Sequence, residues 1–200
     1  MKPESFLVAL LLADKRCVVV GAGAEAVRRA RALLAAGADV LVLGDAPDPE
    51  LEQLALAGEL RLDRRAPTGA DLDSAWLVVL TERDPALAQS LADECARRRL
   101  FFCAVDQPGQ NGFHHVALAR RGPVTLAVAT EGVAPALAKR LRDELEDKVL
   151  TPEFAEFVHH MAELRARLPA ERRKEVLTRE AARVELGRVT LAPREHESGP

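Results

Sequence analysis

A glycine-rich turn between a short apolar run and a helical pattern restricts this chain to few folds. The run at residues 17–20 is apolar throughout, and residues 21–26 follow it in the pattern G-x-G-x-x-A. Gly21 and Gly23 allow a tight turn and a close approach of the backbone to a pyrophosphate, and the small Ala26 lets helix and strand touch. Such a turn predicts a dinucleotide-binding βαβ unit, with a glycine turn that binds nothing as the alternative.

The residues around this turn alternate short apolar runs with helical patterns. We expect buried parallel strands at residues 17–20, 40–43, 60–62, 76–80 and 101–105. The helix after the turn places apolar residues at helical spacing on one face and Arg28, Arg29 and Arg31 on the other, and Gly37 ends it. A second helix is predicted over residues 85–98. This alternation predicts an α/β fold with a Rossmann-like, doubly wound parallel sheet.

A different pattern begins after the turn-rich residues 107–112. It predicts one strand over residues 124–129, a helix over 135–149 and two amphipathic helices over 151–166 and 170–186, and we expect residues 192–200 to be frayed. Residues 150–200 are rich in Arg and Glu and too few for a core of their own. We expect them to pack on the main body or on a second subunit through an apolar stripe that includes Phe154, Phe157, Val158 and Met161.

Charge and composition exclude several classes of protein. The net charge of −3 leaves no bulk positive charge for nucleic acid or an anionic membrane, and 4% aromatic residues argue against a base-stacking surface. Cys17, Cys95 and Cys103 have no metal-binding spacing and are expected to be reduced thiols. The apolar run at residues 6–13 is far shorter than the about 20 residues that span a bilayer, and charged residues follow it. We therefore expect a soluble, cytoplasmic protein.

Two carboxylates follow predicted strands at the edge of the sheet where ligands of such folds bind. Asp45, after the second strand, can accept hydrogen bonds from a ribose 2′-OH and would repel a 2′-phosphate, which favours NAD over NADP; a solvated loop carboxylate is the alternative. Asp106 follows the strand at residues 101–105, and apolar neighbours would let it take up a proton near neutral pH. A cap of the next turn is the alternative for Asp106.

Three segments together resemble the precorrin-2 dehydrogenase domain of siroheme synthases, a dehydrogenase–ferrochelatase family. These are Val18–Gly23 with Arg28-Arg29-Ala30, Val105-Asp106 before a loop to Phe113, and Thr130–Arg142. The resemblance implies an NAD-binding Rossmann domain at residues 1–115, a dimerisation segment at 116–149 and a helical domain at 150–200, with Asp106 as the acid/base of a homodimeric enzyme. We expect NAD to be bound by Gly21, Gly23, Ala24, Glu25, Asp45, Ala46 and Thr81.

Several positions depart from the family pattern. The family has a third glycine where this chain has Ala22, A-T-D-D-x-x-x-N around residues 80–88, and N-V-V-D where this chain has Cys103-Ala104-Val105-Asp106. The two asparagines of these family patterns are therefore missing from this chain. The family has a proline after the phenylalanine that matches Phe113, and this chain has Val116 in its place. Where the family has T-G-G-x-S-P, residues 130–135 of this chain read T-E-G-V-A-P. The pairs His114-His115 and His159-His160 could bind a metal, but surface or hydrogen-bonding roles are the expectation and no metal site is predicted.

The substrate that the resemblance implies is a polycarboxylated tetrapyrrole, precorrin-2, which is oxidised to sirohydrochlorin. Guanidinium and ammonium groups would bind its carboxylates, although each of them alone could be a solvated surface residue; the candidates are Arg120, Arg121, Lys139, Arg140 and Arg142. Some family members also insert iron into sirohydrochlorin, and this activity stays open. A non-catalytic NAD- or tetrapyrrole-binding redox sensor is the alternative. With no room for a methyltransferase domain, we expect precorrin-2 to come from another enzyme.

Overall fold

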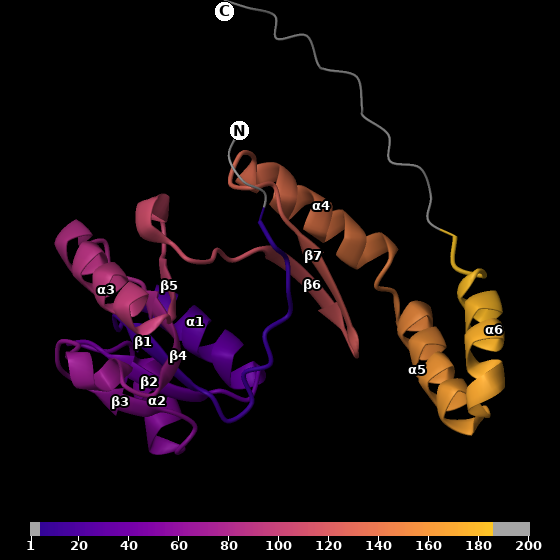
Figure 1. Cartoon of the computed structure of the whole chain (residues 1–200), viewed down its shortest axis with the longest axis horizontal. Helices are drawn as coiled ribbons and strands as arrows, with labels where there is room; N and C mark the ends of the chain where they lie inside the picture. The colour runs from indigo at the N-terminus through magenta and orange to yellow at the C-terminus, as the bar shows by residue number, and fades with distance from the viewer. Residues whose placement is uncertain (1–4, 186–200) are drawn as a thin grey trace, which may run out of the picture. The chain divides into compact units, whose positions relative to one another are not determined.

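The computed structural model describes residues 5–185. These residues form two compact units, one of residues 5–115 and one that contains residues 116–185 (Figure 1). Each unit is described by itself below. None of the described helices is both long enough and apolar enough to cross a membrane.

The first unit contains a parallel sheet of five strands. The strands are β1 (Arg16–Val20), β2 (Asp39–Leu43), β3 (Arg61–Asp63), β4 (Ala75–Leu80) and β5 (Phe101–Ala104). Their order is β3-β2-β1-β4-β5, and every neighbouring pair is parallel. The order reverses between β1 and β4, as in a doubly wound fold, so the predicted fold class is confirmed.

Helices cover both faces of this sheet because alternate strand residues point to opposite sides. The helices α1 (Ala24–Ala35) and α2 (Pro49–Leu56) cover one face, where Cys17 and Val19 of β1 pack in one core with Ala26. The helix α3 (Pro85–Arg98) and the 3-10 helix η1 (Gly69–Leu72) cover the other face, where Val18 packs in a second core with Leu91. The three layers bury most residues of the central strands β1, β2 and β4 on both sides.

The second unit begins with a hairpin. The strands β6 (Ala117–Arg121) and β7 (Val124–Val128) are antiparallel, and Gly122 turns the chain between them with φ +53°. The helix α4 (Pro135–Lys148) contacts both strands, and the helices α5 (Pro152–Arg167) and α6 (Ala170–Ala181) contact each other.

Several boundaries differ from those predicted. The strand β5 ends at Ala104, one residue early, because the chain turns at Val105 and Asp106 before the 3-10 helix η2 (Pro108–Gln110). The helix α6 ends at Ala181 rather than near residue 186. Two elements were not predicted from the sequence: α2, which is short, and β6, whose consecutive arginines hide the strand pattern. Residues 192–200, expected to be frayed, lie outside the described residues.

Candidate functional site

The carboxyl ends of the parallel strands bring four loops to one edge of the sheet. The turn after β1, the residues after β2, the residues after β4 and the loop after β5 all start there. The strand order reverses between β1 and β4, and doubly wound sheets bind their ligands outside the strand ends at this point.

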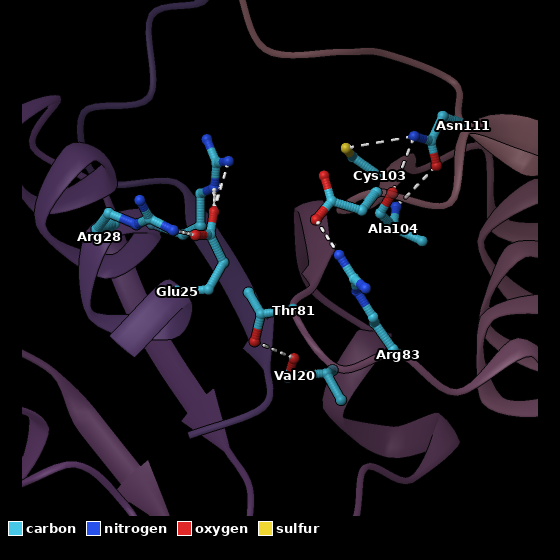
Figure 2. A network of polar contacts seen from close by, with 10 residues as sticks. Val20, Glu25, Arg28, Thr81, Arg83, Cys103, Ala104 and Asn111 are labelled. Carbon is cyan, nitrogen blue, oxygen red and sulfur yellow. Dashed lines mark hydrogen bonds and ion pairs between the residues drawn. The ribbon is translucent and has the colours of Figure 1, made fainter. Parts of the chain in front are cut away.

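Gly21 is required by the fold. Its φ of +113° is rarely adopted by residues with a side chain, and an added Cβ would collide with the Thr81 hydroxyl. The Gly21 N–H donates to the carbonyl oxygen of Leu43 at 2.7 Å. The Thr81 hydroxyl donates to the carbonyl oxygen of Val20 at 3.1 Å (Figure 2). The turn is therefore held by β2 and β4, and Thr81 is part of its support.

Gly23 lies in open space. Its φ is −87°, and nothing lies within 4 Å of the place where a Cβ would stand. Gly23 is the N-cap of α1, and no side chain caps this helix end. The first N–H groups of a helix have no partner within the helix and attract anions. The exposed Gly23 and Ala24 thus leave the start of α1 accessible to a phosphate.

The loop that carries Asp45 lies against the glycine turn. A Cβ on the buried Gly44 would lie 3.0 Å from the Cβ of Ala22, and the Asp48 N–H donates to the carbonyl oxygen of Ala22 at 2.8 Å. Asp45 and Ala46 are exposed, and Ala46 has a φ of +49°. The structure therefore brings Asp45 and Ala46 next to the turn.

Glu25 is engaged by two arginines of its own helix. Its carboxylate pairs with Arg28 (Figure 2). It also accepts from Nε of Arg29 at 2.7 Å. Arg29 was expected on the solvent face, but only 25% of its side chain is exposed. Burial lowers the pKa of the Arg29 guanidinium, while the negative charge of Asp106 opposes this shift. Arg29 therefore belongs to the region near the end of β5, which the helical spacing alone did not reveal.

Asp106 stands in a different environment from the one predicted. The residue has a φ of +60°, and 64% of its side chain is exposed, so the expected apolar surroundings are absent. Its carboxylate accepts from Nη2 of Arg83 at 3.0 Å. Among residues 5–185 this guanidinium, rather than a backbone N–H of the following turn, is its hydrogen-bond partner. Arg83 was not among the predicted site residues, although its place just after β4 at the same sheet edge could have indicated it.

Asn111 is a second missed residue of this edge. Its Oδ1 accepts from the N–H of Ala104 at 2.7 Å, and its Nδ2 donates to the carbonyl oxygen of Ala104 at 3.1 Å (Figure 2). Nδ2 also lies 3.6 Å from Sγ of Cys103. No helical or strand spacing connects Asn111 to β5, so pattern analysis could not find this contact.

The five basic substrate candidates all belong to the second unit. Arg120 and Arg121 are exposed on β6, and Lys139 is exposed on α4. Arg140 pairs with Glu144, and Nη2 of Arg142 lies 2.6 Å from Asp143. Carboxylates of the same helix thus already hold two of the five candidates.

The described residues contain no group of three His, Cys, Asp or Glu side chains that could hold a metal ion. Cys17, Cys95 and Cys103 are free and buried, and burial raises the pKa of each thiol to about 11. Such thiols are neither reactive nucleophiles nor ready metal ligands.

Two family models match the chain. The first, a putative NAD(P)-binding family, covers residues 8–117, and the second, the central part of a sirohaem biosynthesis protein, covers residues 121–148. The siroheme synthase of Enterobacter sp. (strain 638) is 34% identical over 157 residues, which are 78% of this chain and 34% of the relative. The siroheme synthase of Citrobacter koseri is 35% identical over the same shares. The chain thus spans about a third of the length of these relatives.

A solved structure titled SirC, precorrin-2 dehydrogenase, is similar in fold. It superposes with a TM-score of 0.74 over 88% of both chains at 24% sequence identity. The likeness covers both units and supports the Rossmann-like fold of the first.

Proposed function

The chain belongs to the putative NAD(P)-binding family, and from this premise we propose that it is an NAD-dependent dehydrogenase that oxidises precorrin-2 to sirohydrochlorin. The substrate is inferred from the siroheme synthases, which are similar over 78% of this chain, and from the fold shared with a precorrin-2 dehydrogenase. The observation that carries the proposal is the position of Asp106. It follows β5 at the sheet edge that also holds the open glycine turn.

The residues at the start of α1 fit a dinucleotide. The space beside Gly23 is open, the helix end has no side-chain cap, and Asp45 is exposed next to the turn. In this proposal Gly21, Gly23, Ala24 and Ala46 shape the cradle, while Thr81 supports the turn. Glu25 has a different part, because its carboxylate forms ion pairs with Arg28 and Arg29. Bound NAD supplies the hydride acceptor.

Asp106 is the proposed base. Oxidation of the tetrapyrrole removes a hydride and a proton from the ring system, and the Asp106 carboxylate receives the proton. Arg83 orients this carboxylate through its hydrogen bond. The half-buried Arg29, and the basic residues Arg120, Arg121, Lys139, Arg140 and Arg142, are the candidates for binding substrate carboxylates.

A turnover assay tests the proposal. Anaerobically generated precorrin-2 is added to the protein with NAD or with NADP, and the absorbance of the reduced nucleotide is followed. We expect turnover with NAD. Binding of NAD without turnover of precorrin-2 would favour the redox-sensor alternative, and an absence of nucleotide binding would reject the NAD-dependent dehydrogenase. Addition of ferrous iron to protein and sirohydrochlorin, with the siroheme spectrum as readout, tests the ferrochelatase activity.

The proposal also includes a homodimer in the cytoplasm. Exposed apolar side chains of the second unit support a dimer, and the described residues contain no membrane-spanning helix. Nucleic acid and membranes are not expected as partners, since the net charge is −3.

A further inference from the structure

The loop after β5 is attached to the strand by the side chain of Asn111 and by backbone bonds. As the last strand in the order β3-β2-β1-β4-β5, β5 has one sheet neighbour, β4. The side-chain amide of Asn111 binds both backbone groups of Ala104, the last residue of β5. It accepts from the N–H at 2.7 Å and donates to the carbonyl oxygen at 3.1 Å. The Gly112 N–H continues this pairing with a 2.8 Å bond to the carbonyl oxygen of Phe102. Asn111 and Gly112 thus bind β5 as a short neighbouring strand would.

These bonds close a loop that contains Asp106. The chain leaves β5 at Ala104 and is bound to the same residue again at Asn111, so residues 105–110 form a loop with joined ends. Within it, the Gln107 N–H donates to the carbonyl oxygen of Ala104 at 3.2 Å, and Nε2 of Gln107 donates to that of Glu82 at 2.9 Å. Asp106 holds a φ of +60°, a conformation that persists only where the surroundings fix it.

We propose that Asn111 is the positioning residue of Asp106. By binding both backbone groups of Ala104, it fixes the end of β5 and the return of the loop, and so sets where the Asp106 carboxylate stands relative to the sheet edge. Nδ2 of Asn111 also lies 3.6 Å from Sγ of Cys103, so its amide contacts two consecutive residues of β5. This inference rests on the proposed function for the role of Asp106, but not for the closure of the loop.

A double-mutant cycle separates positioning from a general structural role. In Asn111→Ala we expect kcat for precorrin-2 oxidation to fall by roughly tenfold to a hundredfold, since misplaced groups lose rate on this scale. NAD affinity should stay unchanged. Added to Asp106→Asn, the same substitution should have almost no further effect on kcat, because the group that it misplaces is already absent. Equal losses in both backgrounds would overturn the inference.

Two further variants serve as controls. Gln110 lies in the same loop, and Gln110→Ala removes its 2.6 Å bond from Nε2 to Oε1 of Gln89 on α3. This substitution removes no bond to β5, so kcat should stay near that of the original protein. Asn111→Asp keeps an acceptor for the Ala104 N–H but places a second acceptor against the Ala104 carbonyl, so it should lose activity like Asn111→Ala. If Asn111→Ala fails to fold, the cycle is run with Asn111→Asp. A Gln110→Ala loss as large as that of Asn111→Ala would overturn the inference.

Amide hydrogen exchange of the full chain tests the loop without any assay of activity. Asn111→Ala should speed exchange at residues 104–112 and leave the other strands of the sheet unchanged, while Gln110→Ala should have a smaller effect. Unchanged exchange at Ala104 would show that Asn111 does not hold the loop. If the original protein does not oxidise precorrin-2, the proposed function fails, and the exchange experiment still decides whether Asn111 closes the loop.

Discussion

At the scale of single residues, Asp106 combines a backbone that few residue types tolerate with an exposed, paired carboxylate. Aspartate and asparagine adopt positive φ more readily than most residues, so the φ of +60° suits either one. Only aspartate can also accept a proton and pair with Arg83. The apolar run before Asp106 indicated its sheet edge but not its exposure, because a strand pattern does not show where the chain turns. Arg83 and Asn111 come from other segments, so only the folded chain brings them to this site.

Asp106→Asn should therefore remove the base and keep the fold. We expect turnover of precorrin-2 to fall by about 10²- to 10⁴-fold, the usual scale of general-base catalysis. Loss of the exposed ion pair with Arg83 should change the free energy of unfolding by less than about 1 kcal/mol. Turnover is followed through NADH, together with NAD affinity and thermal unfolding of the same variant. Near-normal turnover in a folded, NAD-binding variant would remove Asp106 from the mechanism.

Asp45 should make the protein prefer NAD to NADP. It is exposed beside the glycine turn, where its carboxylate would repel a 2′-phosphate. The two arginines that follow the neighbouring strand β3 already form ion pairs with carboxylates of the protein. Arg64 pairs with Glu52, and Nη2 of Arg65 lies 2.6 Å from Asp71. Calorimetry should show tighter binding of NAD, and Asp45→Ala should narrow the difference. Comparable affinities of the original protein for NAD and NADP would contradict this assignment.

At the scale of elements, the prediction succeeded where local chemistry marks a boundary. The bounds of α3 were predicted because Asp84 and Pro85 form a clear helix start; the Asp84 carboxylate accepts from the Ala86 and Leu87 N–H groups at 3.0 Å. The end of β5 was predicted one residue late because Val105 continues the apolar run. In the structure its N–H still donates to the carbonyl oxygen of Leu80 at 2.9 Å. The prediction that Arg29 lies on the exposed face of α1 was wrong, since tertiary contacts, not helical spacing, decide which polar residues are covered.

The turn between β1 and α1 contains two glycines with different requirements. Gly23→Val should abolish NAD binding and preserve the fold, because nothing in the protein lies near the added Cβ, whereas the branched side chain would fill the space of the pyrophosphate. Gly21→Ala should instead destabilise the protein, because its φ of +113° and the Thr81 hydroxyl leave no room for a methyl group. Thermal unfolding and NAD titration of both variants test this contrast. Retained NAD affinity in folded Gly23→Val would reject the phosphate cradle.

At the scale of the whole molecule, the proposed roles divide between the two units. All cofactor candidates and Asp106 belong to residues 5–115, whereas the five basic substrate candidates predicted from the sequence belong to residues 116–185. The second unit has few buried apolar residues of its own, and no residue of α5 is buried. Val133 and Leu137 are 85% and 52% exposed. Helices with so little covered apolar surface gain most of their stability by packing against another surface.

We expect this surface to come from a second copy of the chain, because two-fold dimers are the commonest closed assembly. Sedimentation at micromolar concentration should show a dimer. Leu137→Glu should shift it toward the monomer, since the charge would have to be buried at the interface. The same variant should still bind NAD, because the glycine turn belongs to the other unit. Ala96→Glu, at an exposed position of α3, adds the same charge in the first unit and should leave the dimer intact. A monomeric original protein would contradict the expectation, and an unaffected dimer in Leu137→Glu would place the interface elsewhere.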